Sequence, residues 1–267
     1  MDRSDKKRIL LKIGSNVLTK ETNVISKIKI RNIARQIFDL KDEYDFVIVS
    51  SGAIVAAKQL VTLEGKDVTV KQALASIGQP YLMQIYQDIF RKIGLLTSQC
   101  LLSYSDFEKE QSKENIVNTI NILIDNHYIP IINENDTVAT DEIKFGDNDK
   151  LGALTASLLN VDLYIIASNT NGIYTKESMN SNNLQTIKKV SDVQSLEKEI
   201  GDFKSTHGTG GLVTKIEAAV IAQNANIEMW IVNGLNDNFL ADAIHNRSDF
   251  TRIIAKKIKD ETLYQHK

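Results

Sequence analysis

Cysteine is nearly absent from the sequence, which contains only Cys100. No intrachain disulfide can form, and a reducing compartment is expected because disulfide frameworks belong to oxidising ones. Cys100 lies in the largely apolar run of residues 99–102. That setting is more typical of a small buried side chain than of a catalytic thiol.

Long hydrophobic runs are also missing. No stretch of about 18 apolar residues occurs, so no transmembrane helix is expected. Residues 1–8 are charged and precede only a short apolar run, which is too short for the core of a signal peptide. These absences predict a soluble, cytoplasmic protein that does not bind membranes.

Neither sign of charge dominates the chain. Lys and Arg number 32 and Asp and Glu number 34, which gives a net charge of −2. A general nucleic-acid binder usually carries a basic patch or stripe, so no nucleic-acid partner is expected. Hydrophobic residues make up 42% and charged residues 25%, as in a folded globular protein.

The sequence has no internal repeat and no clear linker. At about 100–200 residues per domain, 267 residues form one large domain or two small ones. The polar segment 175–185 is typical of a surface loop or hairpin and is too short to join independent domains. We therefore expect a single domain, 1–267, with two lobes on a shared sheet.

Short apolar runs rich in Ile, Val or Leu recur along the chain. Continuous runs of four or five such residues suit strands buried on both faces, as in a parallel sheet. Helical spacing of apolar residues appears between them, after Ser26, over residues 116–124 and, as a third predicted helix, after Thr214. Alternating strands and helices indicate an α/β fold. The five predicted strands are residues 9–13, 46–49, 129–132, 163–167 and 229–232.

Polar residues follow every one of these five runs. Ligands of open α/β sheets bind at the carboxyl ends of the strands, so parallel strands would bring the five polar segments to one ligand-binding edge. The alternative is that loops are simply polar. The segments begin at Gly14, Ser50, Asn133, Ser168 and Asn233.

Two lysines stand out. Lys12 lies inside the first apolar run, where a charge is costly unless it is paired or meets an anion; the alternative is an edge-strand lysine that reaches solvent. Lys215 follows the glycine-rich segment 208–211, which indicates either a phosphate cradle at the start of a helix or merely a flexible turn. The spacing is not that of a Walker motif.

Two carboxylates flank an amide in residues 147–149, just ahead of a helical pattern over residues 151–159. One interpretation is a helix N-cap. The other is a carboxylate that positions lysines, next to side chains that hold a polar substrate. The four histidines show neither the spacing of metal ligands nor that of a catalytic base.

At these residues the chain resembles the amino-acid kinase family. The resemblance spans about residues 9–235 and is carried by five segments in order: KIGSNVL (12–18), VSSGAI (49–54), PIINEND (130–136), GDND (146–149) and GTGGLVTK (208–215). The third and fourth are the most specific. They are similar to those family members that phosphorylate the γ-carboxylate of L-glutamate, in the first step of proline biosynthesis.

The resemblance implies the fold and the site residues. The fold would be a three-layer αβα sandwich with a mainly parallel central sheet, a substrate-binding lobe over about 1–160 and a nucleotide-binding lobe over about 161–267. Lys12 and Lys215 would contact the phosphates, with Asp149 holding both. The substrate residues would be Ser51, Asn133, Asp136, Asp147 and Asn148, and the ATP residues Lys12, Ser168, Asn169, Thr209, Gly210, Gly211, Leu212, Val213, Thr214 and Lys215.

The sequence departs from the family pattern in three places. Ser168-Asn169 stands where members usually have Thr-Asp, so the carboxylate that makes one nucleotide contact in the family is missing here. Val213 stands at a position that is often serine, so a hydroxyl group is missing there too. The chain also looks too short to hold the RNA-modification-type (PUA) domain of many bacterial members. We therefore expect a kinase-only form.

The resemblance also implies cofactors and partners. They are ATP with Mg²⁺, L-glutamate, proline as a feedback inhibitor, a second copy of the chain in a dimer or tetramer, and a link to glutamyl phosphate reductase. Two alternatives remain at this point. One is a related small-molecule kinase acting on aspartate, acetylglutamate or a nucleotide. The other is a non-catalytic sensor of nucleotide or amino acid, suggested by Asn169.

Overall fold

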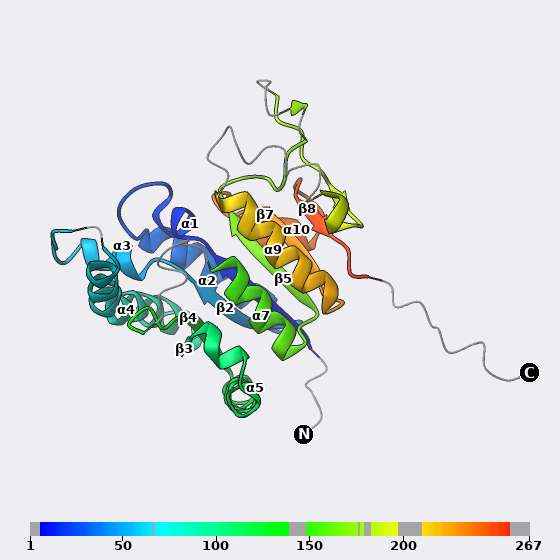
Figure 1. The fold of residues 1–267 in the computed structure, drawn as a ribbon. Helices are drawn as coiled ribbons and strands as arrows, with labels where there is room; N and C mark the ends of the chain where they lie inside the picture. The colour runs from blue at the N-terminus through cyan, green and yellow to red at the C-terminus, as the bar shows by residue number, and fades with distance from the viewer. Residues whose placement is uncertain are drawn as a thin grey trace, which may run out of the picture.

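The computed structural model describes residues 6–65, 67–138, 148–175, 177–178, 183–196 and 210–256. Within them, eight strands form one sheet in the order β3-β4-β2-β1-β5-β7-β8-β6 (Figure 1). The strands are β1 (Lys7–Ile13), β2 (Tyr44–Ser50), β3 (Leu96–Leu102), β4 (Tyr128–Glu134), β5 (Leu163–Ser168), β6 (Lys189–Val190), β7 (Glu228–Asn233) and β8 (Thr251–Ile253).

Strand β1 lies in the interior of the sheet. It pairs in parallel with β2 on one side and with β5 on the other. Strands β4 and β3 continue the parallel order beyond β2, and β7 continues it beyond β5. Only the pairing of β7 with β8 is antiparallel among the described strands. All five predicted strands are confirmed, and so is the mainly parallel sheet.

Helices cover both faces of the sheet. Successive side chains of a strand point to opposite faces, and β1 places Ile9, Leu11 and Ile13 in one apolar core and Leu10 in the other. The first core also contains side chains of α1 (Ser15–Thr19), α2 (Lys27–Leu40), α4 (Val68–Arg91) and α10 (Phe239–Ile244). The second contains side chains of α5 (Glu110–Asp125), α7 (Asp149–Leu159) and α9 (Gly210–Asn224). The expected three-layer αβα arrangement is confirmed (Figure 1).

The helix predictions hold with one exception. The side chain of Ser26 accepts a hydrogen bond from the backbone N–H of Lys29 and caps α2, as the sequence indicates. The predicted stripe of α5 buries Ile116, Ile120 and Ile124. The expectation that the third helix follows Thr214 is wrong, because α9 begins at Gly210. Gly210 and Gly211 therefore belong to the first turn of this helix.

Helix α4 was not predicted, and its contact with α3 (Ala53–Lys58) is unusually close. A Cβ atom at Gly78 would overlap the carbonyl oxygen of Ala53 and lie 2.6 Å from the backbone nitrogen of Ala57. Only glycine lets the two backbones approach this far. The contact holds α4 beside the carboxyl ends of β2 and β4.

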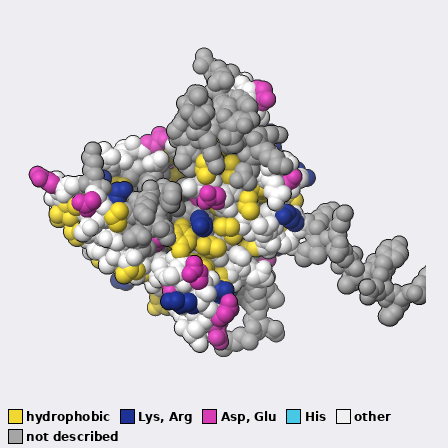
Figure 2. Space-filling model, in the orientation of Figure 1, with side chains coloured by type: hydrophobic (Ala, Val, Ile, Leu, Met, Phe, Trp, Pro, Cys, Tyr) yellow, Lys and Arg dark blue, Asp and Glu magenta, His cyan; other side chains and the backbone are white. Residues whose placement is uncertain are grey.

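The surface mixes charge types. On the face shown in Figure 2, Lys, Arg, Asp and Glu side chains of the described residues are interspersed with apolar ones. Within the part of the chain that the structure describes, no helix combines the length and the hydropathy needed to span a membrane.

Candidate functional site

The carboxyl ends of five parallel strands meet along one edge of the sheet. The pairing places Ile13 beside Ser50 and Ala167, and Ser168 beside Asn233. Strand β4 joins the same row through its pairing with β2. The polar segments that follow the five apolar runs therefore share one edge, as predicted from the sequence.

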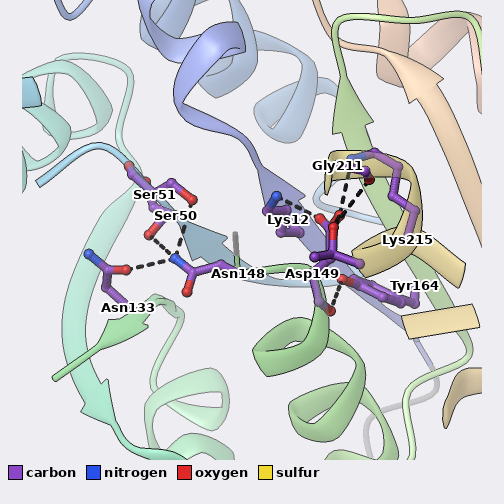
Figure 3. Close-up of polar contacts among 10 residues, drawn as sticks. Lys12, Ser50, Ser51, Asn133, Asn148, Asp149, Tyr164, Gly211 and Lys215 are labelled. Atoms are coloured by element: carbon purple, nitrogen blue, oxygen red, sulfur yellow. Dashed lines mark hydrogen bonds and ion pairs between the residues drawn. The ribbon is translucent and has the colours of Figure 1, made fainter. Parts of the chain in front are cut away.

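Two lysines from distant parts of the chain contact the same carboxylate at this edge (Figure 3). The Nζ atom of Lys12, on β1, lies 2.6 Å from Oδ1 of Asp149, at the start of α7. The Nζ atom of Lys215, on α9, lies 3.0 Å from Oδ2 of Asp149. The Asp149 side chain is fully buried and that of Lys12 is only 4% exposed. Lys12 is thus paired within the protein rather than directed to bulk solvent.

This cluster brings two amines close together. The ammonium groups of Lys12 and Lys215 contact the two oxygens of the Asp149 carboxylate, so one anion placed beside them could contact both. Gly14 and Gly211 keep the space beside the lysines free, since a Cβ atom at either position would lie 3.8 or 3.9 Å from the Nζ atom of Lys12 or Lys215. A phosphate group can therefore reach both amines while α9 directs its positive N-terminal end to the same place.

Neighbouring hydroxyl groups fix Asp149 in position. Thr214 donates a hydrogen bond to Oδ2 of Asp149 at 3.2 Å, and Lys215 also donates to the carbonyl oxygen of Gly211 at 3.1 Å. The buried Tyr164 hydroxyl donates to the backbone oxygen of Asp149 at 2.8 Å. The carboxylate is thus held through both its side chain and its backbone.

Gly152 leaves the room that the Tyr164 hydroxyl needs. A Cβ atom there would overlap this hydroxyl and lie 2.9 Å from Cζ of the ring. We expect Gly152→Ala to destabilise the protein by about 2 kcal/mol, because overpacking costs about 1–3 kcal/mol and outweighs the roughly 1 kcal/mol gained in helix propensity. Urea unfolding measures this change. In the Tyr164→Phe background, which lacks the hydroxyl, the same substitution should cost less; equal costs in both backgrounds would contradict the assignment.

A second cluster lies beside the first and consists of buried amides (Figure 3). Asn148 donates hydrogen bonds to Asn133 Oδ1 at 2.8 Å and to the Ser50 carbonyl at 3.1 Å, with the Ser51 hydroxyl at 3.3 Å. Asn133 in turn donates to Gln79 Oε1 on α4 at 2.8 Å. Asn148 is only 1% exposed. Its Oδ1 atom has no hydrogen-bond partner among the described residues, so it can accept one from a ligand.

A pocket of about 170 Å³ opens onto these amides. Its lining includes Ser51, Asn133 and Asn148 together with Asp136 and, from α4, Lys71. Burial, together with the nearby charge of Glu134, raises the pKa of Asp136 to about 6. A carboxylate with a raised pKa is suited to meet a cationic group, which would restore its charged form.

The two clusters are joined by a single peptide bond. Asn148 belongs to the amide cluster and Asp149 to the lysine cluster, and consecutive Cα atoms are about 3.8 Å apart. A ligand in the pocket and an anion on the lysines would therefore meet at the N-terminal end of α7. The sequence prediction that residues 12, 149 and 215 converge agrees with the observed contacts.

The remaining predicted residues have varied positions. Ser168 ends β5 and is 8% exposed, whereas Asn169 is exposed and donates a hydrogen bond to Glu21 Oε1 at 3.1 Å. Leu212 is half-buried and packs against the second core, and Val213 is also half-buried. Asp147 and Thr209 lie outside the described residues.

The sequence interpretation missed three residues of the site, namely Gln79, Lys71 and Tyr164. The first two belong to α4, whose start does carry a recognisable signal. Asp67 caps this helix by accepting a hydrogen bond from the backbone N–H of Val70 at 2.9 Å. Tyr164 is one apolar-looking member of a buried strand, and nothing in its neighbours indicates a contact with Asp149.

Comparison with known proteins agrees with this geometry. The model of the amino acid kinase family matches residues 7–233. The chain belongs to the amino acid kinase family. The lysines, the carboxylate and the amides of the two clusters all lie within the matched part.

Relatives in this family are similar over nearly the whole chain. A protein named glutamate 5-kinase from Clostridium perfringens (strain 13 / Type A) is 37% identical over 95% of this chain and 97% of its own length. Another of that name, from Alkaliphilus metalliredigens (strain QYMF), is 40% identical over 94% and 97%. A third, from Vibrio vulnificus (strain YJ016), is 38% identical, and the match covers 94% of this chain but 67% of the relative.

Two solved structures of kinases share the fold. Carbamate kinase from Giardia lamblia bound to AMP-PNP has a TM-score of 0.67 at 14% identity, over 95% of this chain and 100% of that one. UMP kinase from Ureaplasma parvum has a TM-score of 0.62 at 17% identity, over 93% and 99%. At such identities the likeness concerns the fold alone.

Proposed function

We propose that this protein transfers the γ-phosphoryl group of ATP to the γ-carboxylate of L-glutamate, which yields ADP and L-glutamyl 5-phosphate for proline biosynthesis. One observation carries the proposal: a pocket for a polar substrate and a pair of phosphate-attracting lysines adjoin at Asn148 and Asp149. The relatives named glutamate 5-kinase, 37–40% identical over nearly the whole chain, support the choice of substrate.

The reaction needs positive charge rather than a base. The γ-carboxylate has a pKa of about 4.3 and is already ionised at neutral pH. Its approach to a phosphate is opposed by roughly 4 kcal/mol for two unit charges about 4 Å apart at an effective dielectric constant near 20. Lys12 and Lys215 can offset this repulsion, and Asp149 keeps their amines in place. Phosphoryl transfer is catalysed mainly by such positioning and charge stabilisation.

The residue roles follow from the two clusters. Asp136 would pair with the ammonium group of glutamate, and Ser51, Asn133 and Asn148 would hold its polar atoms without adding charge. Ser168, Asn169 and the first turns of α9 would contact the nucleotide. In this assignment residues up to about 160 bind the substrate, and those from about 161 onward bind the nucleotide.

Mg²⁺ would enter with the nucleotide. In kinases Mg²⁺ is bound mainly by phosphate oxygens and water, together with one or two carboxylates, so it needs few protein ligands. When bound, it supplies further charge neutralisation of the phosphates.

The deciding experiment is a substrate panel. ADP release is measured with glutamate, aspartate, acetylglutamate and nucleoside monophosphates, and the acyl phosphate is trapped with hydroxylamine. We expect a hydroxamate signal that depends on glutamate. Turnover of another acceptor instead, or nucleotide binding without any turnover by folded protein, would overturn the proposal.

The pH dependence of glutamate binding tests the role of Asp136. Its pKa is raised to about 6, so below that pH the carboxyl group is neutral and must lose a proton before it can pair with an ammonium. We expect the KM for glutamate to rise about tenfold per pH unit below about pH 6, while the KM for ATP stays constant. Asp136→Asn should show a raised KM without this pH dependence. A wild-type KM that is flat down to about pH 5 would contradict the assignment.

Three further partners belong to the proposal. Proline, like glutamate, carries an ammonium group and an α-carboxylate on one carbon, so it should compete with glutamate at Asp136 rather than with ATP.

A dimer or tetramer is supported by Leu96 and Leu101, which are exposed on the edge strand β3. An acyl phosphate is hydrolysed readily in water, which favours rapid use by glutamyl phosphate reductase.

A further inference from the structure

The described part of the pocket lining includes two charged side chains of opposite sign. Among the described residues that line it, Asp136 and Lys71 are the charged ones, and the others are amides, hydroxyls and apolar groups. The two residues come from different elements. Asp136 follows β4, whereas Lys71 is the fourth residue of α4. A pocket with one carboxylate and one ammonium suits a ligand that is itself a zwitterion.

Three contacts place Lys71 at the pocket. Helix α4 is held against α3 by the close approach at Gly78, and Ser76 Oγ lies 3.1 Å from Thr137 Oγ1, one residue after Asp136. Gln79 reaches the buried amide of Asn133. Residues 71 and 79 are eight positions apart, which is close to two helical turns, so they lie on the same face of α4. Lys71 therefore lies at the pocket on the same face of α4 as Gln79, which contacts the buried amide of Asn133.

We propose that Lys71 binds the α-carboxylate of the amino-acid substrate. This inference rests on the proposed function and deepens it. Glutamate brings three charges to the site: the γ-carboxylate goes to the junction beside Lys12, and the ammonium goes to Asp136. Lys12 and Lys215 lie in the neighbouring cluster, beside the γ-carboxylate, so the α-carboxylate is left to a cation of the pocket itself. Among the described residues of the lining, that cation is Lys71.

Lys71 and Asp136 together determine which class of acceptor is accepted. The ammonium and the α-carboxylate of an amino acid are both bonded to Cα. Asp136 and Lys71 would therefore bind these two groups independently of the reaction at the γ-carboxylate. A dicarboxylate without the ammonium leaves Asp136 unmatched. A compound whose α-carboxylate is neutral leaves Lys71 unmatched. The structure thus assigns substrate selection to two residues that lie away from the transferred phosphate.

The test compares Lys71→Met and Lys71→Arg in the full chain. With Met, the KM for glutamate should rise about tenfold to a hundredfold, the range of one lost charge-assisted hydrogen bond, while kcat changes less than about threefold. With Arg, which keeps the charge, the KM should return to within about fivefold of the wild-type value. Inhibition by the α-amide of L-glutamate, which lacks the α-carboxylate charge, should be equally weak in wild type and Lys71→Met.

Other results would overturn the inference. An unchanged KM in Lys71→Met would show that Lys71 does not bind the substrate. A rise that Arg does not reverse, or an equal loss for glutamate and its α-amide, would indicate a structural role for this side chain. Circular dichroism and urea unfolding of both variants establish that they are folded. Wild-type protein that does not phosphorylate glutamate at all would instead refute the proposed function.

Discussion

Replacing Asp149 by Asn is expected to reduce kcat by about a thousandfold and to destabilise the protein by about 3–5 kcal/mol. Each carboxylate oxygen contacts one lysine, at 2.6 Å and 3.0 Å, so the new amide must direct its NH₂ group at an ammonium whichever way it is turned. The variant also removes the carboxylate charge that the buried Lys12 contacts. Urea unfolding and steady-state kinetics measure the two effects.

Added nucleotide separates the electrostatic cause from general misfolding. Its phosphates supply the missing anion, so ATP should stabilise Asp149→Asn by more than it stabilises the wild type. Asp42→Asn is the matched control, because Asp42 pairs with Lys41 at 2.9 Å but its side chain is 84% exposed. Because water screens that exposed pair, its loss should leave the urea midpoint of unfolding nearly unchanged. Similar losses in the two variants would contradict the central role of Asp149.

The second large effect is expected for Lys215→Met. Its ammonium faces the position proposed for the transferred phosphate, where charge is redistributed in the transition state. We expect kcat to fall about a hundredfold to a thousandfold and the KM for glutamate to change less than about threefold. The unequal effect would show that the interaction acts on the transition state rather than on binding of the amino acid. Steady-state kinetics at saturating ATP measures both constants.

Lys150→Met provides the control for this substitution. Lys150 follows Asp149 on α7 but is exposed and lies 5.3 Å from the centre of the Tyr104 ring. Its replacement should change kcat by less than about twofold, since an exposed cation–π contact contributes only about 0.5–1 kcal/mol to stability. If both lysines affect kcat equally, net charge near the site rather than the position of Lys215 explains the result.

Sequence reasoning predicted the interior of the sheet much better than its edges. The five predicted strands are buried on both faces, which makes their runs continuous and apolar. Strand β3 lies at one edge and mixes buried residues such as Thr97 with exposed ones such as Gln99, while β6 and β8 have only two and three residues. Helix α4 was missed because Gly78 and Pro80 inside it are signals that usually end a helix.

The site could be predicted from the sequence where a charged residue stands in an apolar segment. A lysine inside an apolar strand demands an anion, so Lys12 could be found from the sequence, and the family resemblance supplied Asp149 and Lys215 as its partners. Nothing in the sequence around Gln79 and Lys71 indicated a functional site, because polar residues are common on a partly exposed helix. Their importance comes only from the tertiary contact that brings α4 to the pocket.

The peptide bond between Asn148 and Asp149 has a consequence for inhibitor discovery. Any movement that tightens one cluster displaces the other, so we expect the two ligands to influence each other's affinity by one common factor, as linkage requires. Compounds ranked against the amino-acid pocket of nucleotide-free protein would then be ranked against a form whose affinity for them differs from that of the nucleotide-bound protein. Screening in the presence of a non-hydrolysable ATP analogue would present the pocket as it exists during turnover.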